Sequence, residues 1–214
     1  MNLSFQDKSY WEEYYSHADR IPETPSPFAM FLADDGVIAN RSIIELGCGN
    51  GRDAKFFAKT ANSVIAVDQC INTTSMLDKI DGISSYPADF TNLDDVAEAD
   101  KIDVVYSRFT MHAVDVDGEN RTLSWILKNL KPGGLFCCEV RTTKDDLWGK
   151  GVDKGGNVWY YNSHHRRFVV SEEFVSKVKE YGFEIKSAKE DKGFAPYKTE
   201  DPIVLRIITR KPSI

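Results

Sequence analysis

The residues best suited to chemistry lie in a glycine-rich turn that follows a short apolar run. The turn reads Glu45-Leu-Gly47-Cys48-Gly49-Asn50-Gly51 and continues into Arg52. Glycines let the backbone bend sharply, and they let a ligand approach main-chain N–H groups with no Cβ in the way. A dinucleotide-binding turn needs a further glycine where Arg52 stands, so a pyrophosphate ligand is disfavoured. Glu45 adds negative charge beside the turn, and the segment therefore predicts a site for a cationic or zwitterionic cofactor.

Two more acidic positions follow apolar runs farther along the chain. Asp68 ends the run 63–67, and Asp89 with Phe90 follows the run 83–86. A carboxylate at the first position can accept hydrogen bonds from both hydroxyl groups of a ribose. At the second position the carboxylate suits an exocyclic amine, and the ring can stack on an adenine. A single Asp in such a place is more often a cap or turn residue, but three acidic strand ends in succession predict a nucleoside pocket.

These positions need a scaffold, and apolar runs alternate with helical stretches from residue 42 onward. The predicted strands are 42–46, 63–67, 83–86, 102–106, 135–140, 183–188 and 203–209, and the predicted helices between them are 51–60, 71–80, 92–98, 118–130 and 171–181. Continuous apolar strands separated by helices are typical of a parallel sheet covered on both faces. The last two strands lack an intervening helix, which predicts an antiparallel hairpin with a long loop at about 190–201. We therefore expect a doubly wound, Rossmann-like α/β fold with a seven-stranded, mostly parallel sheet.

The 214 residues are predicted to form one domain with four parts. Residues 1–40 form a helical cap, with helices over 7–18 and from Pro27 to about Asp34. Residues 41–141 form the cofactor-binding half, and residues 169–214 form a C-terminal helix and β-hairpin. Residues 142–168 show neither helical nor strand periodicity, yet they contain Trp148, Trp159, Tyr160, Tyr161 and Phe168. A long aromatic loop within a compact domain predicts a lid or substrate-binding insertion.

From Ile43 to about Val140 the chain resembles the class I S-adenosylmethionine-dependent methyltransferases. The resemblance rests on Glu45-x-Gly47-x-Gly49-x-Gly51, Asp68, Asp89-Phe90, the strand end Asp103–Arg108 and the turn Lys131-Pro132-Gly133-Gly134. It implies S-adenosylmethionine as the cofactor. It places the methionine portion beside Gly47, Gly49, Gly51 and Ser107, the ribose at Asp68, and the adenine at Asp89 and Phe90. Further candidate cofactor contacts are Glu45, Cys48, Asn50 and Gln69. In many related enzymes an N-terminal helix closes over the cofactor, so Trp11 is a further candidate contact, against the alternative that it only packs.

The methyl acceptor is expected at the end of the fourth strand. The chain reads Ser107-Arg108-Phe109-Thr110 there, without the Asn/Asp-Pro-Pro-Tyr/Phe that related enzymes use on the amines of nucleic-acid bases. Arg108 is always charged and binds carboxylate or phosphate well, and His112 can take a proton from a hydroxyl near neutral pH. The alternatives are that Arg108 pairs with a nearby acidic residue and that His112 is a satisfied core or capping histidine.

The segment 142–168 adds local positive charge to an acidic protein. It carries five basic and three acidic residues, whereas the whole chain has a net charge of −6. The candidate binding or catalytic residues there are Lys150, His164, His165, Arg166 and Arg167, with Arg141 just before them. A positive lid over a negative body attracts an anionic substrate, and the alternative is a solvated, internally neutralised loop. No Asp, Glu or Cys at ligand spacing accompanies the two histidines, so no metal site is predicted.

Composition narrows the classes of function. The excess of 33 acidic over 27 basic residues disfavours a nucleic-acid partner, and no run approaches the ~18 apolar residues of a membrane span. Four cysteines without C-x-x-C spacing, and an N-terminus without signal-peptide features, predict a cytoplasmic protein. We expect a methyltransferase, monomeric or homodimeric, for a small or glycan-terminal acceptor with an anionic group, modified most readily at oxygen. The alternatives are a detoxifying enzyme for small thiols or oxyanions and a non-catalytic protein that only binds S-adenosylmethionine.

Overall fold

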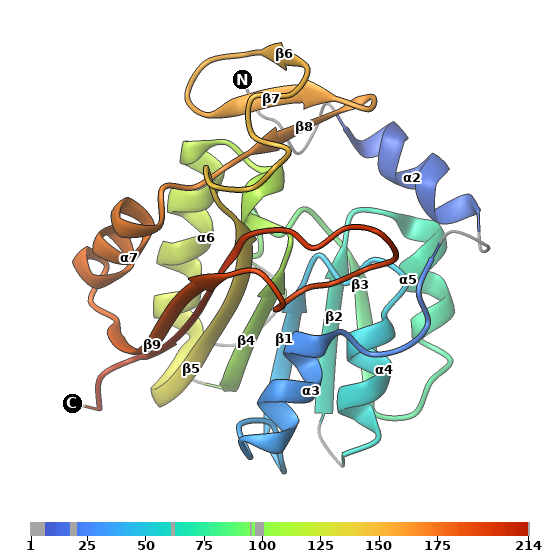
Figure 1. Ribbon diagram of the computed structural model, residues 1–214. Coiled ribbons are helices and arrows are strands. Elements are labelled where there is room, and N and C mark those ends of the chain that lie inside the picture. The colour runs from blue at the N-terminus through green and yellow to red at the C-terminus, as the bar shows by residue number, and fades with distance from the viewer. Residues whose placement is uncertain (1–6, 18–20, 61–62, 95, 97–100, 214) are drawn as a thin grey trace.

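A seven-stranded sheet in the order β3-β2-β1-β4-β5-β10-β9 forms the centre of the protein (Figure 1). The computed structural model describes residues 7–17, 21–60, 63–94, 96 and 101–213. The strands are β1 (Ser42–Leu46), β2 (Ser63–Asp68), β3 (Ile83–Pro87), β4 (Ile102–Arg108), β5 (Leu130–Arg141), β9 (Glu184–Asp191) and β10 (Val204–Arg210). Strand β10 runs antiparallel to both of its neighbours, and the pairings among β1 to β5 are parallel. The predicted sheet with its antiparallel C-terminal hairpin is confirmed.

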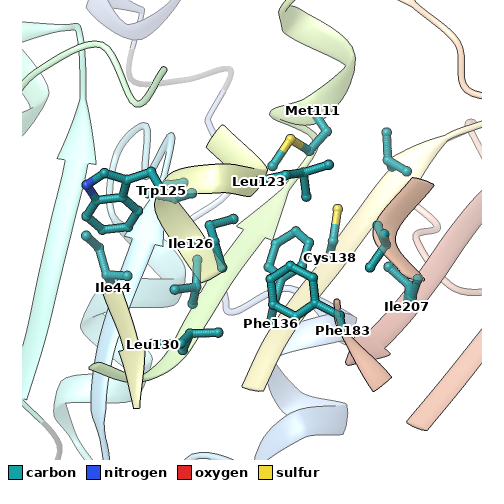
Figure 2. Packing of buried hydrophobic residues seen from close by; sticks show 14 of the residues in the cluster. Ile44, Met111, Leu123, Trp125, Ile126, Leu130, Phe136, Cys138, Phe183 and Ile207 are labelled. Carbon is teal, nitrogen blue, oxygen red and sulfur yellow. The ribbon is translucent and has the colours of Figure 1, made fainter. Parts of the chain in front are cut away.

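Helices cover both faces of this sheet, as a doubly wound fold requires. On one face α3 (Pro27–Asp34), α4 (Arg52–Ala58) and α5 (Ile71–Leu77) enclose a cluster that includes Ile43. On the other face α6 (Val116–Asn129) and α7 (Ser171–Glu180) enclose a second cluster, which includes Ile44 and is shown in Figure 2. Ile43 and Ile44 enter different clusters because successive side chains of a strand point to opposite faces.

The parallel strands end at one common edge of the sheet, and the predicted site residues lie at that edge. The glycine turn follows β1, Asp68 ends β2, Arg108 ends β4 and Arg141 ends β5. Above this edge lie the short 3-10 helix η2 (Met111–Ala113), the N-terminal helix α2 (Lys8–Ser16) and the segment 142–168 (Figure 1). The sheet therefore brings together residues from most of the chain length.

The segment 142–168 contains regular structure, so the expectation that it lacks strands is wrong. A three-stranded antiparallel sheet, β6-β7-β8, is formed by β6 (Val152–Asp153), β7 (Val158–Tyr161) and β8 (His164–Arg167). Strands of two to four residues are too short for alternation to be visible in the sequence. The hairpin signal is the two-residue turn Asn162-Ser163, whose φ angles of 51° and 64° are those of a tight β-hairpin turn. The two ends of the segment meet, because Thr142 is bridged to Val169.

The remaining elements differ from the predictions mainly at their ends. Ser26 caps α3, since its side chain accepts a hydrogen bond from the N–H of Ala29. Strand β5 starts at Leu130, five residues before the predicted strand, and its register against β4 shifts between Ile102 and Val104. The helix predicted over 92–98 is not present where the structure describes that segment, because residues 92–94 and 96 are coil or turn; residues 95, 97 and 98 lie outside the described ranges. Among the helices that the structure describes, none combines the length and apolarity needed to cross a bilayer.

Candidate active site

A cavity of about 480 Å³ lies at the carboxyl edge of the sheet. Its walls come from five parts of the chain: the strand ends with the turns that follow them, α2, residues 21–27, the strand β8, and the loop between β9 and β10. The residues that line it include Tyr10, Trp11, Tyr14, Tyr15, Glu45, Gly47, Cys48, Asn50, Asp53, Asp68, Gln69, Asp89, Phe90, Arg108, Phe109, Thr110, His112, Arg141, His164, Arg166, Tyr197, Lys198 and Glu200. Most of the residues singled out from sequence therefore share one enclosure.

The glycine turn adopts the left-handed backbone that favours glycine. Gly47 and Gly49 have φ angles of 69° and 54°. A Cβ on Gly47 would collide with the side chain of Thr110, and a Cβ on Gly49 would collide with the hydroxyl of Tyr15. Glycine is needed at both positions for the bend and for these close approaches. Gly49 and Gly51 shape the turn without lining the cavity.

Asp68 is a buried carboxylate held in place by the backbone. One oxygen accepts the N–H of Gly49 at 2.8 Å, and the other accepts the N–H of Cys70 at 2.9 Å. Burial raises the pKa of this carboxyl group, and the backbone N–H donors oppose that rise. Each oxygen keeps a second lone pair, so Asp68 can still accept two hydrogen bonds from a ligand diol.

Glu45 is buried in the cavity wall, and its Oε2 atom has no hydrogen-bond partner among the described residues. Burial is the largest cause of a pKa well above the ordinary value, and the nearby charge of Asp53 adds to it. A buried oxygen without a partner is costly. The position therefore suits a ligand that brings a positively charged donor, such as an ammonium group.

The other predicted cofactor contacts divide into two groups. Asp89 and Phe90 line the cavity, and Asp89 also accepts the N–H of Thr91 at 2.9 Å. Ser107 is fully buried outside the lining, and its hydroxyl bonds to that of Thr110, which is the residue that lines the cavity. Trp11 lines the cavity together with three tyrosines of the same helix, Tyr10, Tyr14 and Tyr15.

Three of the four arginines in the wall lie within 4.0 Å of a carboxylate. Arg52 makes the longest of these contacts, with its Nε atom 4.0 Å from Asp53. The Nε atom of Arg108 donates to Glu139 at 2.9 Å, and Glu139 is fully buried. This pairing is the alternative that the sequence left open for Arg108. The Nη1 atom of Arg141 donates to both oxygens of Asp145 at 3.1 and 3.0 Å, and its Nη2 atom donates to Glu200 at 3.3 Å.

Arg166 is different, because no carboxylate oxygen in the described part of the chain lies within 4.0 Å of its guanidinium. Its Nη1 atom donates to the backbone oxygen of Tyr161 at 3.3 Å. Burial lowers the pKa of Arg166, and the charge of Arg141 lowers it further. The guanidinium nevertheless stays protonated near neutral pH. The wall thus contains a guanidinium without an ion pair in the described part of the chain, and the charges of Glu200 and Asp145 reach it only from farther away.

Two histidines line the same cavity and are neutral at physiological pH. His112 is buried, and its Nδ1 atom has no partner among the described residues. Burial lowers the pKa of His112 well below its usual value, and the cations Arg141 and Arg166 lower it further. Burial likewise lowers the pKa of His164 to about 4, and its ring stacks on Tyr10 with centroids 4.2 Å apart.

Three of the residues predicted to bind the acceptor or to act in catalysis do not reach the cavity. Arg167 is buried in an ion pair with Glu119, and it donates to the backbone oxygens of Val114 and Met111. His165 bonds to Asp7, through its backbone N–H at 2.8 Å and its Nδ1 atom at 3.1 Å. Lys150 is exposed away from the cavity lining. Arg167 and His165 fasten β8 to the rest of the fold instead.

The cavity has one wall that sequence reasoning missed, the loop between β9 and β10. Residues 195–200 and Pro202 of this loop line the cavity, and in Figure 1 the loop, in red, passes across the upper ends of the strands. A signal was present, because β9 lies parallel to β5 and must therefore end at the same edge of the sheet. Within the described ranges no group of three or more His, Cys, Asp or Glu residues is arranged to hold a metal ion.

Comparison with known proteins gives one family and a consistent fold. A family model described as a methyltransferase domain matches residues 15–188. A structure of an S-adenosylmethionine-dependent methyltransferase from Methanosarcina mazei superimposes with a TM-score of 0.73 at 14% identity, covering 86% of this chain and 98% of that one. A Burkholderia thailandensis 1,6-didemethyltoxoflavin-N1-methyltransferase, crystallised with 1,6-didemethyltoxoflavin and S-adenosylhomocysteine, superimposes with a TM-score of 0.67 at 17% identity, covering 87% and 77%.

Two curated relatives are plant enzymes. Phosphoethanolamine N-methyltransferase 1 of Triticum aestivum is 28% identical over 143 residues, which are 59% of this chain and 28% of that enzyme. The enzyme of the same name from Zea mays is 30% identical over 144 residues, 60% of this chain and 28% of that enzyme. The matched part of the chain thus spans little more than a quarter of the length of these relatives.

Proposed function

The chain belongs to the S-adenosylmethionine-dependent methyltransferases, and we propose that it methylates a small acceptor whose anionic group is bound by Arg166. S-adenosylmethionine, its cofactor, supplies an electrophilic methyl group on a positively charged sulfur. The acceptor is a small molecule or the end of a glycan chain, and in either case it carries the anionic group that Arg166 binds.

The residues of the cavity fit this cofactor. Glu45 offers an unpartnered, buried carboxylate oxygen to the ammonium group, and Asp68 offers two fixed oxygens to the ribose hydroxyls. Asp89 and Phe90 lie in the same wall and suit the adenine. Each contact pairs a donor or cation of the cofactor with an acceptor that the fold already holds in place, which lowers the ordering cost of binding.

One observation carries the anionic acceptor, namely the charge of Arg166. It lies partly buried in the wall of the cavity, and no carboxylate oxygen in the described part of the chain lies within 4.0 Å of it. A partly buried cation without a close counter-charge is unfavourable, and an acceptor with a phosphate or carboxylate would neutralise it. The neighbouring Arg141 increases the local positive potential.

His112 is our candidate for the proton acceptor. When a hydroxyl acceptor attacks the methyl group, a carbon–oxygen bond forms, the carbon–sulfur bond breaks and the hydroxyl proton must leave. His112 is neutral and lines the cavity. A neutral imidazole has one ring nitrogen without a proton, and that nitrogen of His112 can take the proton. His164 is neutral as well and is the second candidate for this role, because its Nδ1–H donates to the backbone oxygen of Asn162 at 3.0 Å and leaves Nε2 as the nitrogen that can accept a proton.

An amine acceptor is the second candidate, and the curated relatives favour it. Both plant enzymes are named for N-methylation of phosphoethanolamine, a small molecule that combines an amine with a phosphate. Such an acceptor would place its phosphate on Arg166 and its amine at the methyl group. Oxygen and nitrogen acceptors share the anionic group on which the proposal depends.

A labelled-methyl assay across phosphorylated sugars, phosphoethanolamine and carboxylates tests the proposal. We expect Arg166→Gln to raise KM for the accepted substrate about tenfold or more and to leave S-adenosylhomocysteine affinity unchanged. Asp68→Ala is the complementary variant, because it should weaken the binding of S-adenosylhomocysteine that Arg166→Gln leaves unchanged. Turnover of a neutral acceptor that is unaffected by Arg166→Gln would contradict the anionic acceptor. Cofactor binding without methyl transfer to any acceptor would favour a non-catalytic binding protein.

A further inference from the structure

Glu200 places a carboxylate of the protein itself among the arginines of the cavity. It sits at the tip of the loop between β9 and β10, where the backbones of Tyr197 and Glu200 exchange hydrogen bonds of 2.8 and 2.9 Å around a two-residue turn. Its Oε2 atom lies 3.3 Å from the Nη2 atom of Arg141, which is a long contact for an ion pair. The side chain of Glu200 is 61% exposed, so water competes for this contact.

The position of Arg141 does not depend on Glu200. Asp145, a buried residue, binds the Nη1 atom of Arg141 through both carboxylate oxygens. The loop does not depend on the Glu200 side chain either. It is anchored through the backbone of Phe194, whose oxygen accepts from Arg206 at 2.6 Å, and through Asp201, which accepts the N–H of Gly193 at 2.8 Å. The contact between Glu200 and Arg141 can therefore be exchanged while both partners stay in place.

We infer that Glu200 occupies, on Arg141, the position that the anionic group of the acceptor takes, and that it thereby selects acceptors with a doubly charged group. This inference rests on the proposed anionic acceptor. A carboxylate ligand would replace the Glu200 carboxylate on Arg141 with an equivalent contact. It would also have to compete with Glu200, because attachment to the loop gives Glu200 an effective concentration on the order of millimolar. A phosphate monoester can engage Arg141 and Arg166 together, so it gains an interaction that the tethered carboxylate does not make.

Removal of the Glu200 charge should therefore strengthen the binding of phosphate in the cavity. In calorimetric titration of inorganic phosphate into the protein saturated with S-adenosylhomocysteine, Glu200→Gln should lower the phosphate Kd about two- to fivefold. Acetate should bind the unchanged protein at least about tenfold more weakly than phosphate, because it cannot engage both arginines. Glu184→Gln is the matched control, because Glu184 also pairs with an arginine, Arg210, at 2.6 Å but lies outside the cavity lining. It should leave the phosphate Kd unchanged.

The two proposals fail in different ways. An unchanged or weaker phosphate affinity in Glu200→Gln would overturn the role of Glu200, since a residue that only supports Arg141 gives weaker binding when its charge is removed. Equal binding of acetate and phosphate by the unchanged protein would overturn the selection for a doubly charged group. Arg166→Gln tests the proposed function separately, and an unchanged phosphate Kd in that variant would overturn the anion site itself. If no variant binds phosphate, both proposals fall.

Discussion

Glu45 favours binding of the cofactor but destabilises the protein when no cofactor is bound. Its carboxyl group is buried, Asp53 and Asp68 lie nearby with the same charge, and the backbone N–H of Ala54 and the charge of Arg52 oppose the resulting rise in its pKa. Because its pKa is raised on folding, its contribution to stability is complete below the pKa of the unfolded chain. It is lost as pH rises through the folded-state pKa. In the absence of cofactor, Glu45 is therefore a source of instability at neutral pH.

We expect Glu45→Gln to have opposite effects on stability and on binding. Without cofactor, the variant should be more stable by about 1–2 kcal/mol at pH values above the folded-state pKa of Glu45, and the gain should vanish in acid, where Glu45 is protonated. Its affinity for S-adenosylhomocysteine should fall, because the ammonium group loses its charged partner. Urea unfolding from pH 4 to pH 8, with titration of S-adenosylhomocysteine, measures both. A gain that persists unchanged at pH 4 would contradict the electrostatic explanation.

The adjacent residues Arg166 and Arg167 have different roles because neighbouring side chains of a strand point to opposite faces. Arg166 lines the cavity, whereas Arg167 is buried against Glu119, which Lys177 also binds at 2.5 Å. Arg167→Gln should lower the free energy of unfolding by about 2–4 kcal/mol. Arg166→Gln should change it by less than about 1 kcal/mol. Thermal unfolding of both variants checks the contrast, and equal losses of stability would contradict it.

At the scale of elements, α2 is held by its contacts rather than by its own stability. It has nine residues and no buried side chain, and a helix of this length is marginal in water. Asp7, just before it, bonds to His165 of β8, and Tyr10 stacks on His164 of the same strand. At its other end, Tyr15 lies against the glycine turn at Gly49. The helix thus connects the cofactor side of the cavity with strand β8.

Asp7→Ala removes both hydrogen bonds to His165 and should loosen this connection. We expect faster hydrogen exchange of the α2 amides and a roughly three- to tenfold loss of affinity for S-adenosylhomocysteine, because Trp11 and Tyr15 would no longer be held in the cavity wall. Glu13→Ala is the control, since Glu13 is an exposed residue of the same helix. Exchange rates in α2 that match those of the control would show that the helix is held by other contacts.

The sequence predicts the elements that repeat a pattern and misses those that depend on distant contacts. The strands and the helices that cover them follow from apolar runs, and the glycine turn with its acidic neighbours follows from local chemistry. The partner of Arg108 could not be predicted, because Glu139 comes from a neighbouring strand 31 residues away. Arg166 and Arg167 could not be told apart, because the strand that separates their directions is only four residues long. The loop between β9 and β10 was predicted as a loop. The direction of β9 places it at the site edge of the sheet, but no pattern in its own sequence indicates that it lines a cavity.

At the scale of the whole molecule, the sheet supplies the residues that we assign to the cofactor, whereas the two segments added to it supply those that we assign to the acceptor. The sheet edge holds the glycine turn, Asp68 and Asp89, which are the residues that we assign to the cofactor. The segment 142–168 and the loop between β9 and β10 supply Arg166 and Glu200, which we assign to the acceptor. The net charge of −6 therefore averages an acidic fold with a cationic patch at the one edge where the substrates must meet.

If these roles are separable, the segment 142–168 can be shortened without loss of the fold. Its ends are adjacent, since Thr142 is bridged to Val169 and the N–H of Thr143 donates to the Val169 oxygen at 3.0 Å. We expect that replacing residues 144–166 with a short Gly-Ser linker, which keeps Arg167 and Phe168, leaves the far-UV circular dichroism nearly unchanged. Such a linker has little closure cost because the ends already meet.

The same variant should lose methyl transfer altogether, because Arg166 is absent and Arg141 has lost Asp145. Its affinity for S-adenosylhomocysteine should fall by no more than about tenfold, the loss expected when α2 is no longer anchored through His165. An unfolded protein would show that the segment is part of the core rather than an addition to it. Methyl transfer that persists at the rate of the unchanged protein would show that the acceptor binds elsewhere, since the sheet edge alone does not supply an unpaired arginine in the described part of the chain.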